Sequence, residues 1–124
     1  MLFRSINNLD YKALVGEFVN RNQRNFLILD NGRVLSEPYN NLVGRTEVHN
    51  SMRYISKTEL RKFLADYQIS IKQFEITLKA EGLLVYSGKQ RLSTGWRAGQ
   101  NTPPVAVYGF KMDLIDDVID QIAG

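Results

Sequence analysis

Two helix-start signals near the middle of the chain constrain its fold most. Ser56 is followed three residues later by Glu59, and Ser70 is followed at the same distance by Gln73. Both pairs match the capping box, in which a serine side chain and a Glu or Gln satisfy orphan backbone N–H groups. Gly82 stands where a residue with positive φ can end the second helix without steric cost. The sequence therefore predicts two short helices in succession.

Apolar residues recur at helical spacing behind both serines. They are Leu60, Phe63, Leu64 and Tyr67 in the first helix, and Ile71, Phe74 and Leu78 in the second. Residues 83–86 and 105–108 are apolar runs that predict two strands, and Ser87-Gly88-Lys89 predicts a turn after the first of them. Two capped helices joined tightly and followed by a β-hairpin predict a winged helix-turn-helix.

The first 50 residues predict a helix and a small antiparallel β module. Leu14, Val15, Phe18 and Val19 form an apolar stripe, and Asn31-Gly32 between apolar runs is the strongest short-range hairpin signal. The expected elements are a helix over 9–22, a hairpin over 26–35, and strands over 42–45 and 52–55. The chain's single histidine, His49, is expected in an exposed turn.

The expected fold class is α+β, with the whole chain, residues 1–124, as one domain, because this length supports a single core. Its parts are the helix and β-hairpin module over 1–50, the winged helix-turn-helix over 51–111, and a C-terminal helix over 112–124. Residues 51–111 carry ten basic and four acidic side chains, whereas residues 112–124 carry four aspartates and no base. A segment this basic suits a phosphate backbone, although solvated lysines are the commoner explanation of any single one.

The composition argues against several kinds of chemistry. The chain has no cysteine and one histidine, which excludes disulfides and thiolate metal sites and leaves no histidine cluster. None of the phosphate-loop, dinucleotide, zinc-protease or serine-hydrolase motifs occurs. We therefore expect a protein that is not an enzyme and has no cofactor and no metal. No signal-peptide core or long apolar run occurs either, so we expect a cytoplasmic protein with no membrane partner.

The candidate nucleic-acid-binding residues lie on the second predicted helix and the wing. They are Lys72, Gln73, Lys79, Lys89, Arg91, Trp96 and Arg97. Lysine and arginine can meet phosphates, Gln73 can pair with an adenine edge, and Trp96 can stack on an unpaired base. The alternative for Trp96 is packing over the wing or against the N-terminal module.

Ile76 complicates this interpretation, because it puts an apolar residue on the supposed recognition face of the second helix. The same helix has no arginine, the residue most used to read guanine. A protein–protein interaction module therefore stays open as an alternative function. A small dimeric transcriptional regulator is a further alternative, with the C-terminal amphipathic helix as its dimer contact.

Several segments resemble a known family. They are R-N-F-L-I-L-D-N-G-R-V-L at 24–35, V-G-R at 43–45, R-Y-I-S-K-T-E-L-R-K-F-L at 53–64, I-K-Q-F-E-I-T-L-K-A-E-G-L-L at 71–84 and T-P-P-V-A-V-Y-G-F at 102–110. The arrangement resembles the C-terminal region of phage- and mobile-element-encoded replicative ATPases of the helicase and primase-helicase type, filed as domains of unknown function. In that family a core ATPase is followed by a small β-hairpin module and a winged helix.

This sequence departs from the family because it contains no ATPase core, so no catalytic residue can be carried over. The resemblance implies an accessory domain for DNA replication, which engages DNA or binds a replicative ATPase or another protein. The strand form of the DNA, any sequence preference, the protein partner and the oligomeric state stay open.

Overall fold

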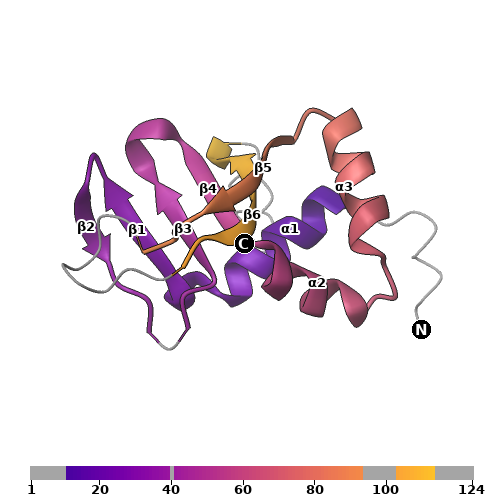
Figure 1. The fold of residues 1–124 in the computed structure, drawn as a ribbon, viewed down its shortest axis with the longest axis horizontal. Coiled ribbons are helices and arrows are strands. Elements are labelled where there is room, and N and C mark those ends of the chain that lie inside the picture. Colours follow the sequence, from indigo (N-terminus) through magenta and orange to yellow (C-terminus); the bar gives the residue numbers. More distant parts are fainter. Residues whose placement is uncertain (1–10, 40, 94–102, 114–124) are drawn as a thin grey trace.

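Six strands form one mixed sheet in the order β2-β1-β3-β4-β6-β5, and three helices accompany it in the part of the chain that is described. The computed structural model describes residues 11–39, 41–93 and 103–113. The helices are α1 (Tyr11–Arg21), α2 (Lys57–Ala65) and α3 (Ile71–Ala80), and two 3-10 turns are η2 (Gln23–Asn25) and η3 (Val48–Asn50). The strands are β1 (Phe26–Asp30), β2 (Arg33–Ser36), β3 (Gly44–Glu47), β4 (Met52–Ser56), β5 (Leu84–Gln90) and β6 (Val105–Lys111). Figure 1 shows β1 and β2 at one end of the long axis and α3 at the other.

The α+β class is confirmed, but the sheet is larger and differently connected than predicted. β1 and β3 pair in parallel, and the other neighbouring strands are antiparallel. β4 joins the two predicted modules, because Tyr54 lies opposite Arg45 of β3 on one side and Gly109 of β6 on the other. The β module of residues 1–50 is therefore neither purely antiparallel nor a separate sheet.

The predicted turn Ser87-Gly88-Lys89 is wrong, because these residues continue β5 and pair with β6 opposite Tyr108, Val107 and Ala106. Gly88 explains the error. A Cβ at this position would lie 2.7 Å from the hydroxyl of Tyr86, so the glycine makes room for a neighbouring ring. A glycine inside a strand often marks such a close approach and not a turn.

The serine half of each capping signal and the glycine at the end of α3 are confirmed. The Ser70 hydroxyl accepts the Gln73 N–H at 3.0 Å, and Gly82 has a φ of +75° just after α3. The Ser56 hydroxyl accepts the Glu59 N–H at 3.4 Å, but the Ser56 N–H donates to the Val43 carbonyl. Because Ser56 also ends β4, its N–H belongs to the sheet and the second half of that capping box is not made.

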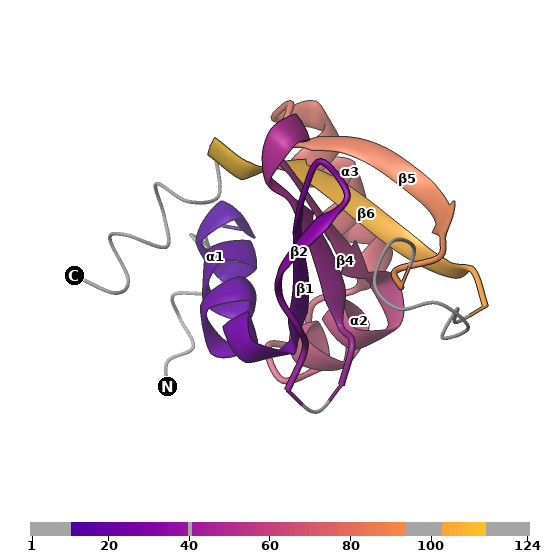
Figure 2. The ribbon, with the colours of Figure 1, turned by 90° about the vertical axis from the view of Figure 1, so that its left-hand side faces the viewer.

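The main core lies between the helices and one face of the sheet, and it combines both predicted modules. Its buried members are Leu14, Val15, Phe18, Val19, Phe26, Val43, Ile55, Leu60, Leu64, Phe74, Leu78, Leu83, Leu84, Tyr108 and Phe110. Figure 2, turned by 90°, shows α1 on the left of the view, with β5 and β6 curving over the right. Beyond Asp113, the predicted C-terminal helix lies outside the described residues.

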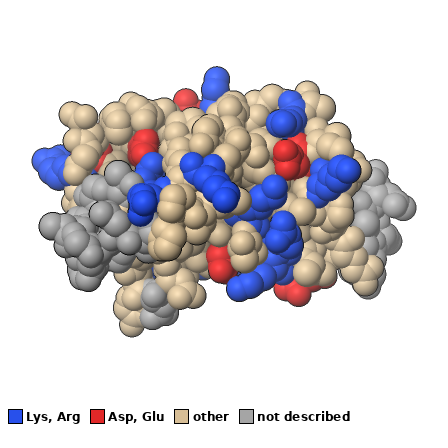
Figure 3. Space-filling model, in the orientation of Figure 1, with Lys and Arg blue, Asp and Glu red and all other residues tan. Residues whose placement is uncertain are grey.

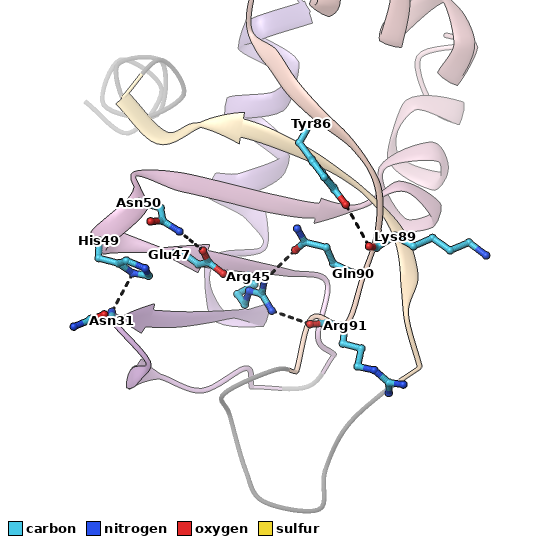
Figure 4. Close-up of polar contacts among 9 residues, drawn as sticks. All are labelled: Asn31, Arg45, Glu47, His49, Asn50, Tyr86, Lys89, Gln90 and Arg91. Carbon is cyan, nitrogen blue, oxygen red and sulfur yellow. Dashed lines mark hydrogen bonds and ion pairs between the residues drawn. The ribbon is translucent and has the colours of Figure 1, made fainter.

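Arg45 holds the other face of the sheet together (Figure 4). Its guanidinium donates to the Arg91 carbonyl at 2.7 Å and to Gln90 Oε1 at 2.9 Å, and it pairs with Glu47 at 2.8 Å. β4 and β6 lie between β3 and β5 in the sheet. An arginine on β3 reaches the end of β5 only if the sheet curls, so Arg45 fixes that curvature.

His49 lies in η3 and is exposed, as predicted for a turn residue. Its Nδ1 accepts the Asn31 backbone N–H at 3.1 Å (Figure 4). Asn31 and Gly32 both have positive φ in the β1–β2 turn, which is what the hairpin signal requires. The histidine therefore ties the tip of that hairpin to the neighbouring turn.

Replacing Arg45 should destabilise the fold strongly. We expect Arg45→Met to lower the free energy of unfolding by roughly 3–5 kcal/mol, because it leaves the poorly exposed Glu47 carboxylate without its cation. Arg33→Met, an exposed arginine on β2, is the matched control and should change that free energy by less than about 0.5 kcal/mol. Urea denaturation measures both, and equal small losses would contradict the role given to Arg45.

Candidate functional site

The structure places five of the seven predicted nucleic-acid-binding residues. Lys72 and Gln73 are exposed in the first turn of α3, and Lys79 is exposed in its last turn. Lys89 is exposed on β5, and Arg91 is exposed directly after it. Trp96 and Arg97 lie outside the described residues, so their predicted contacts stay predictions.

A hydrogen bond between β6 and α3 organises the surface around these lysines. The Tyr108 hydroxyl donates to Glu75 Oε1 at 2.7 Å, and the Tyr108 side chain is otherwise buried in the core. Burial and the Glu75 carboxylate both raise the pKa of Tyr108, so its hydroxyl stays protonated and acts as the donor. The tyrosine thus fixes the position of a carboxylate on α3, at the edge of the core.

Glu75 in turn gathers cations from two helices. Lys57 Nζ of α2 lies 3.8 Å from Glu75 Oε1, and Lys79 Nζ lies 3.7 Å from Oε2. Lys57 also lies over the Tyr108 ring, 5.2 Å from its centroid. The hydrogen bond from Tyr108 lowers the pKa of Glu75, and Lys57 and Lys79 lower it further, against the opposing effect of burial. The carboxylate stays charged at neutral pH and holds both lysines.

Three further cations extend this cluster. Arg61 is one helical turn from Lys57, and its charge acts on Tyr108. Lys72 lies on the same side of α3 as Glu75 and Lys79, because the three residues are spaced three and four positions apart. Lys89 shares a face of β5 with Ser87, which lies opposite Tyr108.

We call this surface the basic face, and define it as Lys57, Arg61, Lys72, Lys79 and Lys89. Figure 3 shows Lys and Arg side chains gathered over α2, α3 and β5, with fewer Asp and Glu among them. Glu75 neutralises part of the charge, and the surface keeps a positive surplus. Such a surface attracts polyanions.

Two members of the basic face were missed by sequence reasoning. Lys57 and Arg61 lie on α2, whereas the prediction considered only the second helix and the wing. Their spacing of four residues along a capped helix was a usable signal, because it puts both side chains on one side. The pair Tyr108 and Glu75 had no local signal, since 33 residues separate them.

The described residues form neither a metal-binding cluster nor a membrane-spanning helix. Across 11–39, 41–93 and 103–113, no group of three or more His, Asp or Glu side chains could hold a metal ion. Within the same ranges, no helix has the length and apolar character needed to span a bilayer.

Comparison with protein-family models, curated proteins and solved structures gave no match for this chain. The resemblance to the C-terminal region of replicative ATPases therefore stays a prediction.

The Glu75 contacts make stability depend on pH. Because folding lowers the pKa of Glu75 below its usual value of 4.5, its stabilising contribution is present above that value and is lost as the pH falls through the folded pKa. We expect Glu75→Gln to reduce stability at pH 7 and to flatten its fall below about pH 5. Thermal melts from pH 7 to pH 3 measure this. Glu81→Gln, an exposed neighbour, should keep the wild-type curve, and a wild-type curve for Glu75→Gln would contradict the account.

Proposed function

We propose that this chain is a non-enzymatic DNA-binding accessory domain or small protein of a phage or mobile-element replication system, and that it contacts DNA through the basic face. The observation that carries the proposal is the joint placement of Lys57 and Lys79 on Glu75, which Tyr108 holds in position. Cations that a carboxylate pre-positions lose less side-chain freedom when a phosphate approaches. The positive charge that Glu75 does not neutralise favours binding of a polyanion over contact with a single acidic residue.

The connectivity around the basic face supports a winged-helix mode of binding. β4 leads into the capped helices α2 and α3, and β5 and β6 follow as an antiparallel pair, in the sheet order β4-β6-β5. In the proposed mode α3 approaches the major groove, and the outer end of the β5–β6 pair acts as the wing. The strands β1, β2 and β3 extend the sheet on the side away from this pair.

The chemistry of α3 favours phosphate contacts over base reading. Its basic residues are lysines, which meet phosphates as point charges, and it has no arginine for bidentate contact with guanine. The Gln73 side chain donates to Thr77 at 3.2 Å along the helix surface. We therefore propose binding with weak sequence preference.

A salt titration tests the proposal. We expect Lys79→Ala/Lys89→Ala to weaken duplex binding at low salt, and to reduce the slope of log affinity against log salt by about 1.8, or about 0.9 for each phosphate contact. Arg33→Ala, which removes an exposed cation from β2, is the matched control and should keep the slope. Fluorescence anisotropy of a labelled duplex measures both.

Absence of duplex binding at low salt would overturn the proposal. An equal loss in Arg33→Ala would show that net charge is responsible and the basic face is not.

A protein-binding function is the second candidate, because two large apolar side chains are exposed beside the basic face. Ile76 on α3 is 54% exposed and Val85 on β5 is 46% exposed. A partner such as a replicative ATPase could cover both side chains. Ile76→Asp separates the two functions, since it should weaken a protein contact through a buried charge, and should weaken DNA binding only by repulsion that salt screens.

A further inference from the structure

A groove crosses the turn η2, where α1 ends and β1 begins. One pocket, of about 290 Å³, is lined by Asn20, Arg21, Gln23, Arg24, Asn25 and Tyr39. A second, of about 310 Å³, is lined by Gln23, Arg24, Phe26, Ile28, Ser36 and Arg53. Gln23 and Arg24 line both pockets, so the two are neighbours. We call them together the η2 groove.

Hydrogen bonds to backbone carbonyls hold the walls of the η2 groove in place. The Asn22 side chain donates to the Phe18 carbonyl at 2.9 Å and closes the end of α1. The Asn25 N–H donates to the Asn22 carbonyl at 2.8 Å, and the Tyr39 N–H donates to the Arg24 carbonyl. The loop that carries Tyr39 is therefore tied to the turn that carries Arg24. A pre-formed groove loses little entropy on binding.

The lining combines positive charge with an exposed aromatic ring. Arg21, Arg24 and Arg53 line the groove, and no Asp or Glu is among its described lining residues. Arg21 pairs with Glu17 and lies over the Phe63 ring, which fixes it, whereas Arg24 is exposed. The Tyr39 side chain is 74% exposed, the highest value among the exposed large hydrophobic residues of the described chain.

The amide side chains complete the chemistry. Asn20, Gln23 and Asn25 line the first pocket, and each carries both a donor and an acceptor. Gln23 Nε2 donates to Asn20 Oδ1 at 3.3 Å, a long and exposed contact that a ligand can replace. Proteins bind the unpaired bases of single strands by stacking them on aromatic rings or arginine, and by hydrogen bonds from polar side chains to the base edges.

We propose that the η2 groove binds single-stranded nucleic acid, with Tyr39 stacked on a base and Arg24 on an adjacent phosphate. Each pocket has the size for a base or nucleotide and not for a duplex. This site shares no lining residue with the basic face. Tyr11 at the start of α1 packs on Phe74 of α3, and the groove lies at the other end of this helix, which is about 15 Å long. On the side of α2, the groove residue Arg21 lies over the Phe63 ring.

The test uses labelled oligo-dT and a matched oligo-U on the full chain. We expect Tyr39→Ala to weaken single-strand binding roughly 5- to 150-fold, the range for losing one stacked base. Tyr39→Phe keeps the ring and should bind like wild type. Arg24→Ala should reduce the salt slope by about 0.7, the single-strand value for one phosphate. Comparing the affinities for oligo-dT and oligo-U shows whether the groove prefers DNA or RNA. A preference for either one supports the site.

Controls separate this proposal from the DNA-binding one. Both side chains are exposed, so the variants should melt at the wild-type temperature, and they should bind duplex as wild type does. Arg33→Ala, at the far end of β2, should bind single strands normally. Wild-type single-strand affinity in Tyr39→Ala would overturn the proposal, as would a loss in Arg33→Ala equal to that in Arg24→Ala. Displacement of oligo-dT by a phosphopeptide at equal concentration would assign the groove to a protein and overturn it too.

Discussion

The hydrogen bond from the Tyr108 hydroxyl to the Glu75 carboxylate is the interaction on which the proposed binding surface depends. A hydroxyl that is largely removed from water needs an acceptor, and a carboxylate at the edge of the core needs compensation for lost solvation. The Tyr108 hydroxyl donates a hydrogen bond to the Glu75 carboxylate at 2.7 Å, which satisfies both groups. The ion pairs with Lys57 and Lys79 further stabilise the carboxylate charge. One contact therefore joins β6 to α3, anchors α2 through Lys57, and orients cations outward.

Local signals in the sequence predicted most of the individual elements. The Ser70 hydroxyl, Gly82 and the Asn31-Gly32 turn act over a few residues, and the structure has a cap, a helix end and a hairpin at these positions. Lys72 and Lys79 were found in the same way, since exposed lysines follow from helix periodicity. Lys89 was also identified, although the turn predicted for it is wrong and it lies on β5. Helix caps, helix ends and tight turns depend on residues that are close in the sequence, so they can be predicted without knowledge of the fold.

The rest depended on contacts between distant residues. The parallel pairing of β1 with β3 and the junction at β4 have no short-range signal. Gly88 was assigned to a turn because its pairing with Val107, which makes it part of a strand, joins residues far apart in the chain. Arg45 reaches Gln90 and Arg91 across two intervening strands. The same reason hid the η2 groove, where the loop at Tyr39 meets the end of α1.

Backbone amide NMR shifts during a duplex DNA titration at low salt test the central claim most directly, because they report contact residue by residue without any substitution. The account predicts the largest changes at Lys57 and Arg61 on α2, along α3 and at Lys89, with little change at Arg33 in the β1–β2 hairpin. Uniform small changes, or changes centred on that hairpin, would contradict the assignment of the basic face as the DNA-binding surface.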